Sequence, residues 1–320
     1  MHDKNNTLFG DKGLNVLSLC DGMSCGQIAL TELGFKINNY YASEIDKVAI
    51  KCTQDNFPNT IQLGDVTKIT DNMLHSLPRI DLVMFGSPCR SLSKTTMGRS
   101  EYNNGLRGSS GLFYSCAKIL KWIQINNNSM VYFLVENVDS NHKDDIHEMS
   151  KILGVEPVLI NANLFSAQDR ARNYWTNIPI NKLPDKCSLV LRDIMDSNVD
   201  EKYYYTQSYD YYDGKKVCAI LHMKGHDHMK RVNNPNYKSP TLTACRGGNV
   251  QKKVYDHGRC RKLTPHEYRK LQTIPEWYKM NFADSHIYNM CGDGWCIEVI
   301  KHILRGLSNE TIHSQRYADT

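Results

Sequence analysis

Short apolar runs alternate with helix-like stretches through the first half of the chain, and this alternation restricts the fold more than any other feature. Runs of strand character occupy 15–20, 40–43, 80–85 and 131–135, with helical patterns between them. Such alternation is typical of βαβ units, in which consecutive strands lie parallel and helices cover the sheet. We therefore expect an α/β fold with a doubly wound sheet, in which ligand sites form at the carboxyl ends of the strands.

Reactive side chains follow the last two of these runs. Cys89 comes directly after the third run and its turn, and Glu136 comes directly after the fourth. Arg170 and Arg172 follow further along the chain. A thiol, a carboxyl and two guanidinium groups are what is needed to add a thiolate to an electron-poor ring, share a proton with it and hold its oxygen. These four residues are our candidate catalytic groups, although each alone is also compatible with a structural role.

A glycine-rich turn, Asp21-Gly22-Met23-Ser24-Cys25-Gly26, follows the first run. Glycines let the backbone approach a bound group, and the next helix offers free N–H donors at its start. Glu44 closes the second run, at a spacing suited to accepting hydrogen bonds from ribose hydroxyls, and Asp65 occupies another predicted strand end. The chain has no G-x-G-x-x-G sequence, which disfavours a dinucleotide as the ligand.

Taken in order, these motifs resemble those of the cytosine-C5 DNA methyltransferase family, and the resemblance runs from about residue 14 to residue 307. It rests on Gly86-Ser87-Pro88-Cys89, Glu136-Asn137-Val138 and Gln168-Asp169-Arg170-Ala171-Arg172, together with the glycine-rich turn. The resemblance implies a Rossmann-like, S-adenosylmethionine-dependent fold with a mixed sheet and a small loop-rich recognition domain inserted late. The implied parts are a catalytic cofactor-binding domain at 13–181, a target-recognition domain at 182–260, a C-terminal segment at 261–307 that rejoins the first domain, and a tail at 308–320.

The resemblance also implies S-adenosylmethionine as the cofactor. The residues expected to hold it are Asp21, Gly22, Met23, Ser24, Gly26, Glu44, Ile45, Asp65, Val66, Asp293 and Trp295. Two positions depart from the family's pattern. Cys20 stands where an aromatic residue is common, and Asp293 stands where asparagine is usual.

For catalysis, the resemblance implies that the Cys89 thiolate adds to C6 of a cytosine flipped out of double-stranded DNA, after which the methyl group passes to C5. Glu136 would act at N3, and Arg172 with Arg170 would hold O2. Most relatives have Pro-Pro-Cys-Gln here, whereas this chain has Ser87-Pro88-Cys89-Arg90, and the serine also occurs in the animal de novo branch.

The positive charge of the chain is concentrated in one segment. Residues 201–262 carry 13 Lys and Arg against 5 Asp and Glu, a balance of +8, whereas the whole chain carries +5. The same segment holds eight of the 18 tyrosines. A basic, aromatic-rich surface is typical of nucleic-acid binding. The residues expected to contact DNA are Arg90, Ser93, Thr95, Thr241, Leu242, Arg246, Gly247 and Gly248, in part because 239–249 resembles the family's recognition sequence.

Several classes of protein are disfavoured. No apolar stretch approaches the length of a membrane span, and residues 1–12 lack the apolar core of a signal peptide. The 11 cysteines include no CxxC pair, and His222, His226 and His228 lack cysteine partners, so we expect reduced thiols and no metal site. We expect a monomer that acts in the cytoplasm and is encoded by a prokaryote or a phage.

Three other functions are alternatives to a DNA cytosine-C5 methyltransferase. An RNA cytosine-C5 methyltransferase could carry the same catalytic set, but the chain lacks the Cys-Phe-Thr sequence of the tRNA-directed branch. An exocyclic-amine methyltransferase would have Pro-Tyr or Pro-Phe where this chain has Pro88-Cys89. A catalytically silent DNA-binding paralogue stays open because of Cys20, Arg90 and Asp293.

Overall fold

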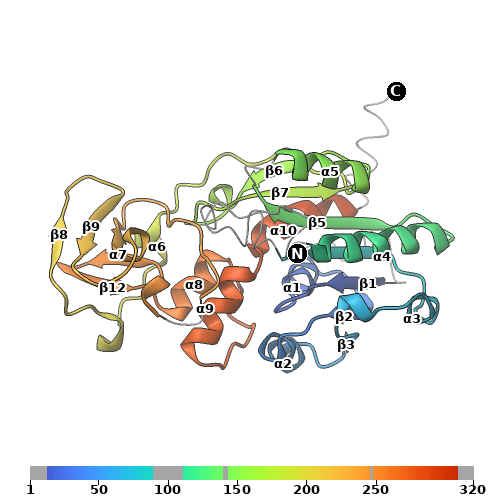
Figure 1. Ribbon diagram of the computed structural model, residues 1–320, viewed down its shortest axis with the longest axis horizontal. Helices are drawn as coiled ribbons and strands as arrows, with labels where there is room; N and C mark the ends of the chain where they lie inside the picture. Colours follow the sequence, from blue (N-terminus) through green and yellow to red (C-terminus); the bar gives the residue numbers. More distant parts are fainter. Residues whose placement is uncertain (1–12, 89–110, 140–142, 246–247, 309–320) are drawn as a thin grey trace. The chain divides into compact units, whose positions relative to one another are not determined.

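A computed structural model describes residues 13–88, 111–139, 143–245 and 248–308. The described residues divide into two compact units, each with its own sheet (Figure 1). Unit 1 comprises the described residues within Met1–Ile160, Ala171–Lys182 and Ile300–Thr320. Unit 2 comprises those within Asn161–Arg170 and Leu183–Val299.

Unit 1 is built on a seven-stranded sheet with the order β3-β2-β1-β4-β5-β7-β6. β1 pairs in parallel with β2 and with β4, β4 pairs in parallel with β5, and β7 runs antiparallel to β5. This mixed α/β sheet confirms the predicted fold class. The strands are β1 (Leu14–Leu19), β2 (Ile37–Ser43), β3 (Ile61–Gln62), β4 (Leu82–Gly86), β5 (Tyr132–Val138), β6 (Val158–Asn161) and β7 (Ala171–Thr176).

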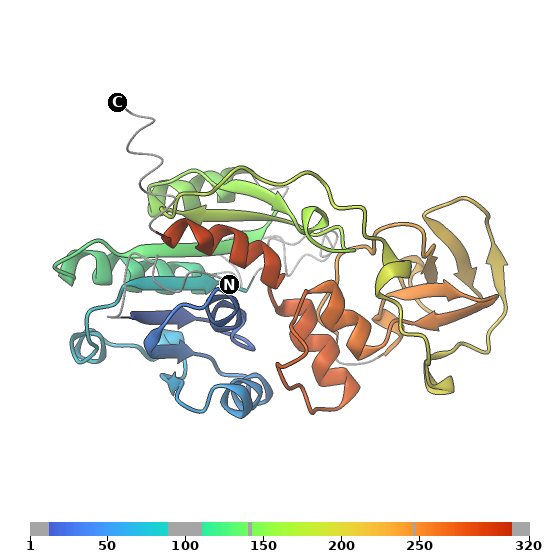
Figure 2. The same ribbon diagram turned by 180° about the vertical axis from the view of Figure 1, so that it is seen from behind.

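Helices cover both faces of this sheet, as the two opposite views in Figures 1 and 2 show. On one face, Phe85 of β4 packs in the main apolar cluster with Phe113 of α4 and Met149 of α5. On the other face α1 approaches β4 so closely that a Cβ at Gly26 would lie 2.4 Å from Met84 Cε. Before residue 160, the described helices of unit 1 are α1 (Cys25–Glu32), α2 (Lys47–Asn56), η2 (Val66–Lys68), α3 (Asp71–His75), α4 (Leu112–Asn126) and α5 (Lys143–Leu153), and most of the last helix, from Ile300 onward, also belongs to this unit.

Unit 2 contains a five-stranded sheet with the order β12-β11-β10-β9-β8. Its strands are β8 (Tyr209–Tyr211), β9 (Val217–Leu221), β10 (Arg231–Asn233), β11 (Lys253–Asp256) and β12 (Arg259–Lys262). The chain before β8 also reaches the other edge of the sheet, because Tyr204 forms an antiparallel bridge with Arg261 of β12. The sheet therefore curls, and the rings of Tyr209 and Tyr255 meet at 5.9 Å across it.

Helix α8 (Pro265–Leu271) begins with reciprocal hydrogen bonds between Thr264 and Glu267. The Thr264 hydroxyl accepts a hydrogen bond from Glu267 N, and the Glu267 carboxylate accepts one from Thr264 N, which is a capping box. The last described helical segments are α10 (Ile297–Leu304) and η10 (Arg305–Leu307). The other helices are η7 (Ala162–Leu164), α6 (Leu191–Ile194), η8 (Glu201–Tyr203), α7 (Asp227–Lys230), η9 (Gly248–Val250) and α9 (Asp284–Asp293).

Candidate active site

Three turns of unit 1 lie at the same edge of its sheet because β1, β2 and β4 run parallel. Asp21 follows β1, Glu44 follows β2 and Ser87 follows β4. β1 lies between β2 and β4, so the chain turns in opposite directions on its two sides. Such a switch point is where open α/β sheets bind ligands. The structure thus brings the predicted cofactor turns and the start of the predicted catalytic turn to one edge.

Asp21 is the acid of this edge, partly exposed as a residue but with a buried carboxylate oxygen. Its Oδ1 accepts a 2.9 Å hydrogen bond from the Tyr40 hydroxyl. Its Oδ2 is buried and has no hydrogen-bond partner among the described residues. Burial raises the pKa of Asp21 to about 6. A buried carboxylate oxygen without a donor is available to a hydrogen-bond donor of a ligand.

The rest of the glycine-rich turn is shaped by packing. Gly22 adopts a φ of 58°, a left-handed conformation that favours glycine. Met23 and Ser24 are 2% and 0% exposed, and the Ser24 hydroxyl donates to Gln27 Oε1 at 3.1 Å. Gly26 lies against Met84 as described above. These side chains support the turn from within, so we expect any ligand to contact its backbone and Asp21.

Glu44 is fixed by three backbone donors. Gly22 N donates to Oε2 at 2.7 Å, and the N–H groups of Ile45 and Asp46 donate to Oε1 at 2.7 and 2.9 Å. A carboxylate oxygen has about two acceptor positions, so Oε2 retains one for a ligand hydroxyl. Beside it, the Ile45 side chain is 71% exposed, which is unusual for a large apolar residue.

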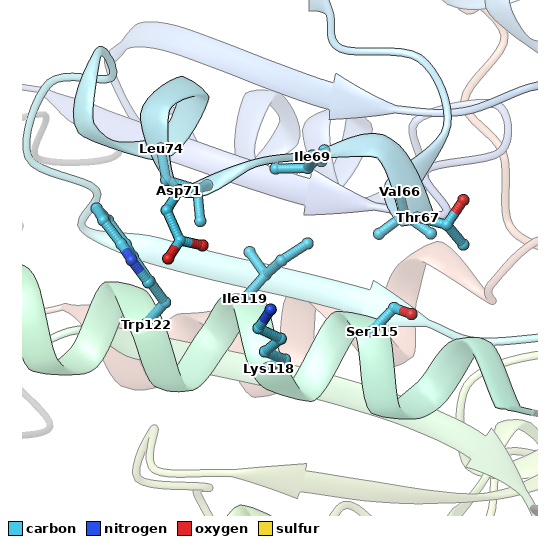
Figure 3. Close-up of a pocket in the computed structure, with 9 residues that line it drawn as sticks. All are labelled: Val66, Thr67, Ile69, Asp71, Leu74, Ser115, Lys118, Ile119 and Trp122. Carbon is cyan, nitrogen blue, oxygen red and sulfur yellow. The ribbon is translucent and has the colours of Figure 1, made fainter.

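The predicted pair Asp65 and Val66 lies at the start of η2. Asp65 accepts hydrogen bonds from Thr67 N and Thr67 Oγ1 at 2.9 and 2.8 Å, and these bonds lower the pKa of Asp65. Val66 is buried and borders a pocket of about 130 Å³ (Figure 3). Figure 3 shows Trp122 and Lys118 on α4 facing the segment that carries Val66. The remaining lining residues are Thr67, Ile69, Asp71, Leu74, Ser115 and Ile119.

Glu136 and Arg172 form the ion pair of the predicted catalytic set. Glu136 lies on β5 and Arg172 on the antiparallel neighbour β7, where Arg172 is in register with Val138. The Arg172 Nε lies 3.0 Å from Glu136 Oε1. Both side chains are largely buried, with exposed fractions of 13% for Arg172 and 11% for Glu136. The pair holds the Glu136 carboxyl in a fixed position near the end of β5, largely shielded from water.

Ser87 connects the β4 turn to the same strand. Its hydroxyl accepts a 3.2 Å hydrogen bond from Asn137 Nδ2, and Asn137 is the neighbour of Glu136. The sequence analysis did not assign Asn137 a role, although it is part of a quoted motif. Ser87 is two residues before Cys89. This hydrogen bond therefore connects the segment just before the predicted nucleophile to strand β5. Cys89 itself lies outside the described residues, as do Arg90, Ser93 and Thr95.

Arg170 has different surroundings from Arg172. It belongs to unit 2 and is 5% exposed. Its guanidinium group donates to three backbone carbonyls, those of Leu242, Gly292 and Gly294, at 2.9, 3.1 and 2.9 Å. This geometry favours a role in holding the backbone of unit 2, and it differs from the direct contact with the base that the sequence analysis expects of Arg170.

The predicted recognition sequence is anchored by the residues before Arg170. The Thr241 hydroxyl donates to Asp169 O at 2.6 Å, and Leu242 N donates to Gln168 Oε1 at 2.8 Å. Leu242 is 1% exposed, so we expect it to shape this segment and not to contact DNA with its side chain. Gly248 opens η9. Arg246 and Gly247 lie outside the described residues.

Three of the twelve basic side chains that the structure describes in the basic segment are internal. Lys238, Lys253 and Arg261 are 6%, 1% and 0% exposed. Arg261 pairs with Asp256 and Glu267, at 2.6 and 2.7 Å. A charge count over the sequence therefore overestimates the charge that can reach phosphate groups. Exposed tyrosines remain on this unit, namely Tyr211, Tyr212 and Tyr237.

The last two predicted cofactor residues belong to unit 2. Asp293 ends α9 and is exposed, and Trp295 follows it with intermediate exposure. Helix α9 packs tightly against the recognition sequence, because a Cβ at Gly292 would lie 2.2 Å from Ala244 N.

The described residues contain neither a metal-binding cluster nor a membrane-spanning helix. Among residues 13–88, 111–139, 143–245 and 248–308, no group of three or more His, Cys, Asp or Glu is arranged to hold a metal ion. Within the same ranges, no helix combines the length and apolar character needed to cross a membrane.

The comparisons with known proteins all match methyltransferases. The family model for the C-5 cytosine-specific DNA methylase matches residues 14–309. The type II methyltransferase M1.ScrFI of Lactococcus lactis subsp. cremoris is 28% identical over 300 residues, covering 85% of this chain and 74% of that protein. The type II methyltransferase M.DsaV of Dactylococcopsis salina is 25% identical over 322 residues, covering 91% of this chain and 85% of that protein. The structure of the Entamoeba histolytica methyltransferase EhMeth shares the fold, with a TM-score of 0.68 at 15% identity over 92% of this chain and 98% of that chain.

Proposed function

The chain belongs to the C-5 cytosine-specific DNA methylase family, and on this premise we propose that it transfers the methyl group of S-adenosylmethionine to carbon 5 of cytosine in double-stranded DNA. The observation that supports this most is the largely buried pair of Glu136 and Arg172, with Nε and Oε1 3.0 Å apart. Ser87 reaches the same strand through Asn137 and leads directly to Cys89. The strand that precedes Cys89 in the sequence, β4, is a neighbour of β5, which carries Glu136, and β5 is a neighbour of β7, which carries Arg172.

The residues of unit 1 suit the proposed cofactor. Glu44 Oε2 retains an acceptor position for a ribose hydroxyl, and the exposed Ile45 offers an apolar surface for a base. Asp21 Oδ2 is a buried acceptor without a donor, which suits the charged amino group of the methionine moiety. When bound, the cofactor supplies a methyl group activated by its positively charged sulfur. Asp293 and Trp295 remain part of the proposed set of cofactor residues.

In the proposed reaction the Cys89 thiolate forms a bond to C6 of the cytosine, and the displaced electron pair makes C5 nucleophilic. Glu136 shares a proton with N3 of the cytosine and accepts a hydrogen bond from its exocyclic amine. Arg172 holds the Glu136 carboxylate in place through Nε and is available to O2 of the base. After C5 has taken the methyl group, water removes the C5 proton and the sulfur–C6 bond breaks, which restores the aromatic ring. The base must leave the helix stack for these contacts to form.

Unit 2 is proposed to bind the DNA. It carries exposed tyrosines and basic side chains next to one another, such as Lys215, whose ammonium lies 5.1 Å from the Tyr212 ring centroid. Thr241 and Gly248 flank the positions where Arg246 and Gly247 would meet the DNA. We propose the domain limits 13–181, 182–260 and 261–307 as functional regions of a monomer. The bacterial relatives support a cytoplasmic enzyme that belongs with restriction-modification systems.

The test is methyl transfer from labelled S-adenosylmethionine to duplex DNA and, in parallel, to structured RNA, followed by identification of the methylated nucleoside. We expect 5-methyldeoxycytidine from the wild type and none from Cys89→Ala, with cofactor affinity retained in the variant. Label in RNA only would favour the RNA methyltransferase. Cofactor binding without transfer to either nucleic acid would contradict both enzymatic functions.

A further inference from the structure

Two thiols lie side by side at the proposed cofactor edge. Cys20 follows β1 directly, and Cys116 lies in the middle of α4, with their sulfur atoms 4.0 Å apart. A disulfide bond is about 2.05 Å long, so the sulfurs need to approach by about 2 Å. Both side chains belong to the apolar cluster of unit 1, Cys116 as a buried member and Cys20 as a partly buried one. Both lie in the same unit and on well separated parts of the chain.

Cys20 is held in an uncommon conformation. Its φ is 53°, in the left-handed region that side-chain-bearing residues seldom adopt. The next residue is anchored on both sides, since Asp21 N donates to Ser43 O and Asp21 O accepts from Ser24 N. Such conformations persist where the surroundings enforce them, and they cluster at functional sites. The turn therefore fixes the Cys20 sulfur next to Cys116.

We propose that Cys20 and Cys116 form a reversible disulfide when the protein meets a peroxide, and that this bond weakens binding of the cofactor. The second half of the proposal rests on the proposed function, whereas the first half does not. This assigns a modification site to a position where the sequence departs from the family's usual aromatic residue.

The chemistry assigns different roles to the two thiols. Cys20 is partly exposed, so its thiolate can attack hydrogen peroxide, forming Cys20 sulfenic acid and releasing hydroxide. The Cys116 sulfur then attacks the Cys20 sulfur, the sulfur–oxygen bond breaks, and the Cys116 proton leaves with the oxygen as water. In total, two thiols lose two hydrogen atoms and one peroxide becomes two waters. The hydrogen bond with Cys20 and burial raise the pKa of Cys116, so Cys116 stays a neutral thiol and does not react with peroxide itself. It gives up its proton only as it attacks the oxidised Cys20.

The bond would disturb the cofactor turn because only a few hydrogen bonds hold that turn, whereas Cys116 is held by the hydrogen bonds of a long helix. Cys116 is fixed within the 15-residue helix α4, so closure must draw Cys20 and with it the Asp21–Gly22 backbone. Gly22 N is the donor to Glu44 Oε2 at 2.7 Å. Loss of one hydrogen bond to a charged group corresponds to about a tenfold change in affinity or more. We therefore expect the oxidised protein to bind S-adenosylmethionine about tenfold more weakly.

The first experiment maps the disulfide in the full chain. The protein is treated with hydrogen peroxide, free thiols are blocked, and the unreduced digest is examined by mass spectrometry. We expect a peptide pair that joins Cys20 to Cys116 and disappears on reduction. It should be absent from Cys20→Ala and from Cys116→Ala, and present in Cys187→Ala, which removes the other partly exposed described cysteine. Oxidation of Cys20 to sulfinic acid without cross-linking, or its pairing with another cysteine, would overturn the proposal.

The second experiment measures the affinity for S-adenosylmethionine by calorimetry, which avoids the separate effect of oxidising Cys89 on turnover. Peroxide should weaken binding by the wild type about tenfold and dithiothreitol should restore it, while Cys116→Ala should bind equally before and after peroxide. Equal affinity of the cross-linked and reduced wild type would refute the effect on the cofactor. If the reduced protein does not bind S-adenosylmethionine, the proposed function fails, and the disulfide is still judged by the mass map.

Discussion

Replacement of Asp21 by asparagine is predicted to stabilise the ligand-free protein at neutral pH and to leave its stability unchanged in acid. The carboxyl is buried at the end of β1, and burial raises its pKa from 3.8 to about 6. Asparagine has nearly the same shape, keeps an acceptor for the Tyr40 hydroxyl and carries no charge that must be desolvated. The substitution therefore removes the cost of burying a carboxylate.

The size and sign of the effect follow from the two pKa values. Between pH 3.8 and about 6 the folded protein binds a proton at Asp21 that the unfolded chain has released, so the free energy of unfolding falls as pH rises. Below this range the carboxyl is neutral in both states, so its burial does not lower the free energy of unfolding. Above this range the folded protein bears the full cost of burying the carboxylate. A shift of about 2 pKa units at about 1.4 kcal/mol each gives up to about 3 kcal/mol. Asp21→Asn should gain this amount at pH 8.

The assay is urea unfolding of wild type and variant at several pH values from 4 to 8. The difference between the two proteins cancels the titration of all groups that they share. Asp65→Asn is a matched control of opposite sign, because Thr67 lowers the pKa of Asp65, and its loss should cost stability at neutral pH and less in acid. A difference for Asp21→Asn that does not change with pH, or a variant less stable than wild type at pH 8, would refute the reasoning.

Three further substitutions test other parts of the account. Glu136→Gln should lower kcat for methyl transfer by about 10²–10⁴ without changing the affinity for S-adenosylmethionine, whereas Glu148→Gln, on an exposed helix face, should change neither. Gly292→Ala should destabilise unit 2 by at least about 1–3 kcal/mol in urea unfolding, because its Cβ would lie 2.2 Å from Ala244 N. Arg170→Met should cost about 3 kcal/mol or more, since it removes the Arg170 donor from the buried carbonyls of Leu242 and Gly292 and leaves Gly294 O with the Gln272 amide, and a wild-type unfolding curve would contradict the assigned role.

Much of unit 1 could be predicted from local sequence. Runs of apolar residues such as 80–85 are central strands buried on both faces, and these give the clearest signal in a sequence. The start of α8 was equally predictable, because Thr264 and Glu267 satisfy each other's backbone groups. Strand order and the antiparallel direction of β7 were not predictable, since they depend on pairing between distant segments.

The sheet of unit 2 was missed for a physical reason. Its strands are three to five residues long, and all except β9 are rich in tyrosine and charged residues. Periodicity needs a longer run to be visible. Arg261 is the clearest case, because its side chain is 0% exposed and yet its charge suggests a surface position. Only the folded structure provides the Asp256 and Glu267 partners that make its burial possible.

The candidate site was predicted in part. Motif order identified Glu136 and Arg172, and the structure joins them in one ion pair. The same motif assigned Arg170 to the base, whereas its guanidinium binds backbone carbonyls of unit 2. The two arginines are two residues apart, and the boundary between the units falls between them. The sequence contains no sign of that boundary.

The most direct test of the central claim is conversion sequencing of unmethylated genomic DNA after incubation with S-adenosylmethionine and either the wild type or Cys89→Ala. The account predicts 5-methylcytosine in one short sequence context with the wild type and none with the variant. Equal methylation by both proteins, or no methylcytosine from a wild type that binds the cofactor, would contradict it.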